Sequence, residues 1–130
     1  MAAHRVVIQE QRAYSFAASD TVELVRYVDT LAWVSGVLEV TVYDASLTGA
    51  NTLDVEIDNI SPAPDDPRRA FVAGQVATVR LNPSTTAPKL LTDAFTTPIA
   101  SHVRVRLVFT HAEGGAQTAT LGIALIGRER

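Results

Sequence analysis

The chain contains no cysteine among its 130 residues, and so disulfide bonds, thiolate metal sites and cysteine nucleophiles are excluded. Its hydrophobic runs are far shorter than the roughly 20 residues of a membrane-spanning helix. The first residues also lack the apolar segment of a secretory signal peptide. We therefore expect no membrane partner, and a protein of the cytoplasm or of a particle assembled there.

A basic excess is also lacking, because the formal net charge is -3. Proteins that bind nucleic acids are usually basic, so we expect no nucleic-acid partner. Hydrophobic residues make up 47% of the chain and charged residues 19%, which is typical of a folded protein with a core. A length of 130 residues predicts one domain over 1–130.

Alternation of apolar and polar residues is the main structural signal in the sequence. A period of two is typical of a strand that buries one face only. The alternation and the turn residues between the segments predict seven or eight strands. The central ones are 22–28, 38–43, 53–60, 76–81, 102–110 and 121–125.

Two segments allow alternatives. Residues 1–20 contain two short apolar runs, 6–8 and 14–16, and form either an edge strand or an N-terminal arm that pairs with a neighbouring subunit. In 88–95, Leu91 and Phe95 are four residues apart after Pro88, which predicts at most one short helix.

These elements predict an all-β fold, an antiparallel β-sandwich. The proline-rich connections 61–69 and 82–88 suit crossovers between sheets and favour a jelly roll, with an immunoglobulin-like sandwich as the alternative. The strands 38–43 and 53–60 could form a hairpin, and 113–116 predicts a tight turn.

Residues that could support catalysis or metal binding are scattered. His4, His102 and His111 are well separated, and the last two lie at opposite ends of one predicted strand. The acidic pair Asp65–Asp66 lacks the spacing of a calcium loop. No nucleophile motif or phosphate-binding glycine loop is present. We expect no enzyme activity, no metal and no cofactor.

Two rows of charge on the predicted strands remain as candidate interface residues. The acidic row alternates along 53–58, the basic row along 103–107, and a further arginine lies in 76–81. The candidates are Asp54, Glu56, Asp58, Arg80, Arg104 and Arg106. If the two strands are neighbours, the rows pair within the sheet. If they lie on opposite sheets, a face of one sign could meet the opposite face of another copy.

The aromatic residues offer two candidates for contact with a ligand. Trp33 either fills a gap between the sheets or under a loop, or stacks against a ligand. Tyr43 is predicted to point outward from its strand.

Part of the chain, mainly 33–71, resembles small β-sandwich proteins of phage and phage-like particles. The shared features are Trp33, Gly36, alternating Leu38-Val40-Val42, Gly49, Ser61-Pro62, Asp66-Pro67, Phe71, Ala87-Pro88, Leu90-Leu91 and Leu121-Ile123-Leu125. This resemblance implies a structural protein, often a trimer or a decoration on a capsid surface, without catalytic residues. We therefore predict a non-enzymatic, self-assembling or decoration component of a virus-like particle. The alternative is a small ligand-binding or carbohydrate-binding module.

Overall fold

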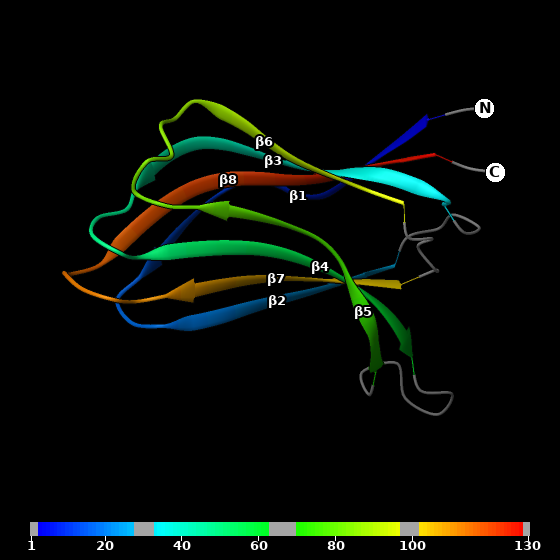
Figure 1. The fold of residues 1–130 in the computed structure, drawn as a ribbon, viewed down its shortest axis with the longest axis horizontal. Helices are drawn as coiled ribbons and strands as arrows, with labels where there is room; N and C mark the ends of the chain where they lie inside the picture. The colour runs from blue at the N-terminus through cyan, green and yellow to red at the C-terminus, as the bar shows by residue number, and fades with distance from the viewer. Residues whose placement is uncertain (1–2, 28–32, 63–69, 97–101, 129–130) are drawn as a thin grey trace.

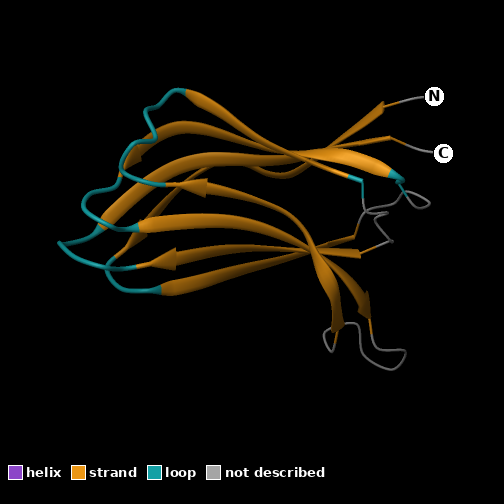
Figure 2. Ribbon diagram, in the orientation of Figure 1, coloured by secondary structure: helices purple, strands orange, loops and turns teal. Residues whose placement is uncertain are grey.

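A computed structural model describes residues 3–27, 33–62, 70–96 and 102–128. Figure 2 shows only strands and loops in this part of the chain, and the all-β fold class is therefore confirmed. The eight strands are β1 (Ala3–Phe16), β2 (Asp20–Tyr27), β3 (Ser35–Ser46), β4 (Thr52–Pro62), β5 (Ala70–Leu81), β6 (Lys89–Phe95), β7 (His102–Thr110) and β8 (Gln117–Arg128). In the same residues, no helix has the length and hydrophobicity that crossing a bilayer requires.

The strands form two facing antiparallel sheets, with orders β1-β8-β3-β6 and β2-β7-β4-β5 (Figure 1). The pairing is nested, because β1 pairs with β8, β2 with β7, β3 with β6 and β4 with β5. The chain is thus one long hairpin rolled across two sheets, which is a jelly roll. The immunoglobulin-like alternative is wrong, because that fold divides its strands differently between its sheets.

Consecutive strands lie in different sheets, with β4 and β5 as the exception. The predicted hairpin between 38–43 and 53–60 is therefore wrong, since β3 and β4 belong to opposite sheets. The turn around 113–116 likewise leads from β7 to β8 in the other sheet. Of the two proline-rich connections, the one after β5 crosses between sheets as expected. The one after β4 returns within the same sheet, because β4 and β5 are paired.

The short helix predicted near 88–95 is wrong, since this segment is β6 and pairs with β3. A spacing of four residues brings two side chains to one side of a helix, but it also brings them to one face of a strand. Phe95 is buried and Leu91 half-buried, so the same face of β6 packs on the core. A spacing of four therefore does not distinguish the two structures.

Residues 3–16 form one strand, β1, at the edge of the first sheet. The two apolar runs both pair with β8 of the same chain, and the polar run between them carries two register shifts, at Val7/Gln9 and Gln9/Arg12. The edge strand is therefore continuous but bulged.

The core lies between the sheets and is made by the inward side chains of both. Phe16 stacks on Phe109 with ring centroids 4.8 Å apart, and Tyr14 continues the stack. Trp33 is fully buried against Gly127, where a Cβ atom would overlap the indole ring. The interpretation of Trp33 as a core residue between the sheets is confirmed.

Candidate functional site

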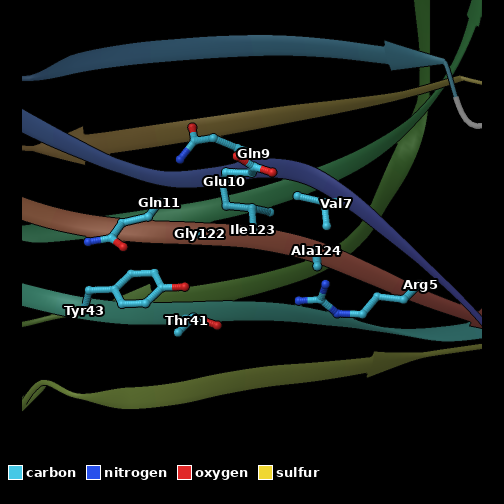
Figure 3. A pocket seen from close by; sticks show the side chains of 10 residues that line it. All are labelled: Arg5, Val7, Gln9, Glu10, Gln11, Thr41, Tyr43, Gly122, Ile123 and Ala124. Atoms are coloured by element: carbon cyan, nitrogen blue, oxygen red, sulfur yellow. The ribbon is translucent and has the colours of Figure 1, made fainter.

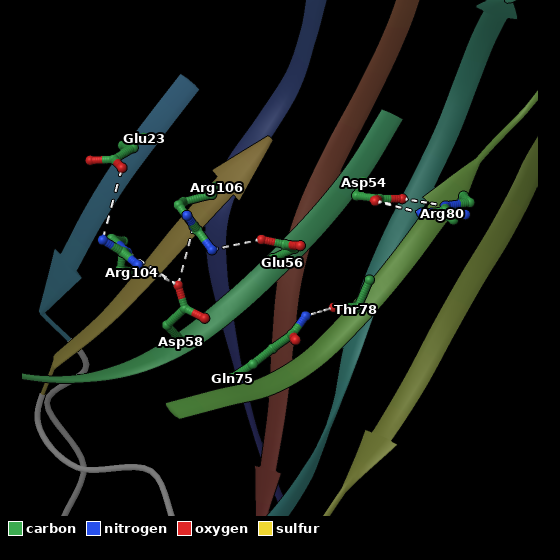
Figure 4. A network of polar contacts seen from close by, with 9 residues as sticks. All are labelled: Glu23, Asp54, Glu56, Asp58, Gln75, Thr78, Arg80, Arg104 and Arg106. Atoms are coloured by element: carbon green, nitrogen blue, oxygen red, sulfur yellow. Dashed lines mark hydrogen bonds and ion pairs between the residues drawn. The ribbon is translucent and has the colours of Figure 1, made fainter. Parts of the chain in front are cut away.

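The acidic and basic rows lie side by side on the outer face of the second sheet (Figure 4). Strand β4 carries the acidic row and β7 the basic row. Glu56 is directly opposite Arg106, and Asp58 is opposite Arg104. The alternative in which the rows lie on opposite sheets is therefore wrong.

Asp58 is the centre of this network. Its Oδ2 lies 2.8 Å from Arg104 Nη2 and 3.3 Å from Arg106 Nε, and only 3% of its side chain is exposed. The alternation along 53–58 predicts that this carboxylate points into solvent. Instead the two arginine side chains approach it from β7, and a register shift between Ile57 and Asp58 interrupts the pairing with β5. A buried carboxylate is tolerated where cations compensate for its lost hydration.

The remaining charges extend the network to both edges of the sheet. Arg106 Nη2 donates to Glu56 Oε2 at 2.9 Å, and Arg104 Nη1 lies 3.9 Å from Glu23 on β2. On β5, Arg80 donates twice to Asp54, at 2.7 and 3.0 Å. This hydrogen bond, together with the carboxylate charge, raises the pKa of the Arg80 guanidinium above its ordinary value.

All six candidate interface residues therefore have partners within their own subunit. Their contact with another subunit stays a prediction. Because their charges are already matched, attraction to a second charged face would have to replace existing pairs.

The outer face of the first sheet differs in character. Within the described residues, the exposed large hydrophobic side chains are Val7, Tyr43 and Leu90, and each belongs to this sheet. Tyr43 points outward as predicted and is 47% exposed. Trp33, being fully buried, offers no ring face to a ligand.

Two hollows lie on this face, separated by an ion pair. Arg5 Nε on β1 lies 3.7 Å from Glu39 Oε1 on β3. Because β8 runs between these strands, the pair passes over it, between Ala124 and Ile126.

One hollow, the polar hollow, has a volume of about 350 Å³ and surrounds the small residues Gly122 and Ala124 of β8 (Figure 3). Its lining residues come from β1, β3 and β8: Arg5, Val7, Gln9, Glu10, Gln11, Thr41, Tyr43, Gly122, Ile123 and Ala124. We did not predict this hollow from the sequence. Gly122, inside the predicted strand 121–125, was the available signal, since a glycine within a strand often marks a bulge or a close backbone approach.

The other hollow, of about 340 Å³, lies at the opposite end of the face. Beside it, Ala94, Val37 and Ile126 form a continuous cross-strand series from β6 through β3 to β8, which we call the apolar row.

No cluster of three histidine or acidic residues that could hold a metal ion occurs in 3–27, 33–62, 70–96 and 102–128. His111 follows β7 directly, and its ring nitrogen Nε2 contacts the carbonyl of Gly114 at 3.1 Å. The pair Asp65–Asp66 lies outside the described residues.

No protein-family model matches the chain, and no curated protein matches its sequence. Solved structures do match its fold. The infectious bursal disease virus VP2 subviral particle is similar over 98% of this chain, with a TM-score of 0.61 and 14% identity. The structures of the Gx and Gt strains of the same virus give TM-scores of 0.56 and 0.55, each over 97% of this chain at 14% identity.

The matched region is about a third of each of those chains, between 31% and 32%. At this identity the similarity concerns the fold. The resemblance to β-sandwich proteins of virus-like particles is confirmed at that level.

Proposed function

We propose that this chain is a non-enzymatic structural subunit of a virus-like particle, and that it assembles with copies of itself. The jelly roll supports this proposal, because nearly the whole chain superimposes on part of a protein from a subviral particle. Fold alone does not establish function, and so a feature of this chain's own surface is needed.

The apolar row is the observation that carries the proposal. Ala94 and Ile126 flank Val37 on neighbouring strands, and an open hollow adjoins the three side chains. Grouped apolar side chains on an outer sheet face are typical of protein contact surfaces. The opposite face, by contrast, has its charges paired internally.

We therefore place the contact between copies at the apolar row. A trimer, attachment to a capsid surface and assembly in the cytoplasm remain predictions within this proposal.

Light scattering coupled to size-exclusion chromatography tests the proposal, together with electron microscopy of the same fractions. The wild-type chain should form a defined oligomer or particle at micromolar concentration. Ala94→Arg, at an exposed position on β6, should shift the population to smaller species. Thr21→Arg is the matched control, because Thr21 is exposed on β2 of the other sheet.

A wild-type chain that stays monomeric across this concentration range would contradict self-assembly. Equal effects of the two substitutions would contradict the role of the apolar row.

A further inference from the structure

We propose that the polar hollow binds a neutral saccharide, with Tyr43 as the platform for one pyranose ring. The Arg5–Glu39 pair separates the polar hollow from the apolar row. The proposed site therefore does not depend on the proposed contact between copies.

The shape of the hollow follows from residue size. Gly122 and Ala124 are the outward residues of β8 here, and both are too small to fill the space between β1 and β3. A volume of about 350 Å³ is at the lower end of the range of ligand pockets. The hollow is open to solvent on one side, which suits a sugar ring resting on a surface.

Tyr43 provides the apolar contact that such a ring requires. Figure 3 shows its ring lying over the sheet with one face toward the viewer, next to Gly122 and Gln11. The ring is close to the strand below it, because a Cβ on Gly122 would lie 3.5 Å from Tyr43 Cε2. An aromatic ring that is half exposed and supported from below offers its free face to the C–H groups of a pyranose.

Polar groups surround this platform. Thr41 is opposite Gly122 on β3, and the side chains of Glu10 and Gln11 come from the bulged part of β1. Amide and hydroxyl groups both donate and accept hydrogen bonds, as sugar hydroxyls do.

The bulge is held in place by Gln9. Its Nε2 donates to the Leu121 carbonyl at 3.1 Å, and its Oε1 accepts from the Tyr14 hydroxyl. The polar side of the hollow is therefore organised before a ligand arrives, which lowers the cost of binding.

Charge favours a neutral ligand. Arg5 is paired with Glu39, while Glu10 adds a carboxylate to the rim. The Glu10 carboxylate would repel an acidic sugar. Arg5 is the cation among the lining residues, and it is already paired with Glu39.

Saturation-transfer difference NMR tests the proposal, because it reports on the ligand and works with monomers or particles. The probes are the methyl glycosides of glucose, galactose, mannose and N-acetylglucosamine, with N-acetylneuraminic acid as the acidic comparison. At least one neutral probe should bind with a Kd on the order of 1 mM. Tyr43→Ala should weaken it roughly tenfold, and Tyr43→Phe should retain it.

Leu90→Ala is the matched control, since Leu90 is exposed on the same face but does not line the hollow. Absence of binding by every neutral probe, preference for the acidic sugar, or equal binding by Tyr43→Ala would each overturn the proposal. A monomeric chain that still binds the sugar would contradict self-assembly and leave this site in place.

Discussion

Asp58 and Arg104 lie directly opposite each other on β4 and β7, although 46 positions separate them in the chain. Their atoms Oδ2 and Nη2 are 2.8 Å apart, and the carboxylate is nearly inaccessible to solvent. This pair connects the two halves of the rolled hairpin on the outer face of its sheet.

We expect Asp58→Ala to lower the free energy of unfolding by about 2 kcal/mol, because two guanidinium groups lose their shared partner. The cost is below that of a fully buried pair, since the side chains of Arg104 and Arg106 are 20% and 32% exposed and can regain water. Urea denaturation measures the change.

Glu56→Ala is the control, because Glu56 is more exposed and, among the residues that the structure describes, pairs with Arg106 alone. It should cost less than about 1 kcal/mol. Equal losses of unfolding free energy for the two variants would show that the burial of Asp58 does not contribute to stability.

Gly127→Ala should destabilise the chain by about 3 kcal/mol, because the added methyl group overlaps the Trp33 ring in a packed interior. Thermal unfolding gives the loss of stability, and the fluorescence emission of the single tryptophan reports whether its ring becomes exposed.

Gly115→Ala is the control, since a Cβ there meets no atom of the described residues within 4 Å. Its unfolding free energy should change by less than about 0.5 kcal/mol. An unchanged Tm for Gly127→Ala would contradict the close contact.

Strand β6 was predicted as a short helix. Most of the other strands could be predicted because each buries one face, and burial of that kind appears directly as alternation. Their pairing could not, because a jelly roll joins strands that are far apart, such as β1 and β8, and no local signal records the partner. Proline content was likewise a poor guide, since one proline-rich loop crosses between sheets and the other does not.

The candidate sites, like the strand pairing, could be predicted only in part from local sequence signals. Alternation placed Glu56 and Arg106 on outer faces, but only the register between β4 and β7 shows that they pair. The burial of Asp58 depends on the arginines that approach it from the next strand. Tyr43 was predicted to point outward, whereas the hollow beside it also needs Gly122 from β8 and the bulge of β1.

Asn51 connects two loops at one end of the sandwich and should be sensitive to substitution. It is fully buried, and its Nδ2 donates to the carbonyls of Thr48 and Glu113, each at 2.8 Å. Its Oδ1 accepts from the Ala112 amide. Asn51→Ala removes the side-chain partner of the Glu113 carbonyl and the Ala112 amide, while the Thr48 carbonyl keeps its bond from the backbone amide of residue 51. We expect a loss of about 2 kcal/mol.

Urea denaturation measures this loss, and hydrogen exchange at Ala112 should accelerate in the variant. Asn82→Ala is the control, because Asn82 accepts an exposed hydrogen bond from the Ser84 amide. Exposed bonds of this kind contribute about 1 kcal/mol or less. A larger loss for Asn82→Ala than for Asn51→Ala would contradict the role of Asn51.

Asp93 joins the two sheets where β5 and β6 form neighbouring edges. Its Oδ2 accepts a hydrogen bond of 2.9 Å from the backbone amide of Thr78. A side chain of one sheet thus provides the partner for a backbone N–H on the edge strand of the other sheet.

Asp93→Ala should lower the free energy of unfolding by about 1.5 kcal/mol, because this charge-assisted bond is lost and the amide of a half-buried residue is left to water. Hydrogen exchange at Thr78 should accelerate, while exchange in the centre of β7 should follow only the change in global stability. Asp20→Ala is the matched control, since Asp20 accepts an exposed hydrogen bond from the adjacent Thr21 amide. Unchanged exchange at Thr78 in Asp93→Ala would show that the sheets are held together at this edge by packing alone.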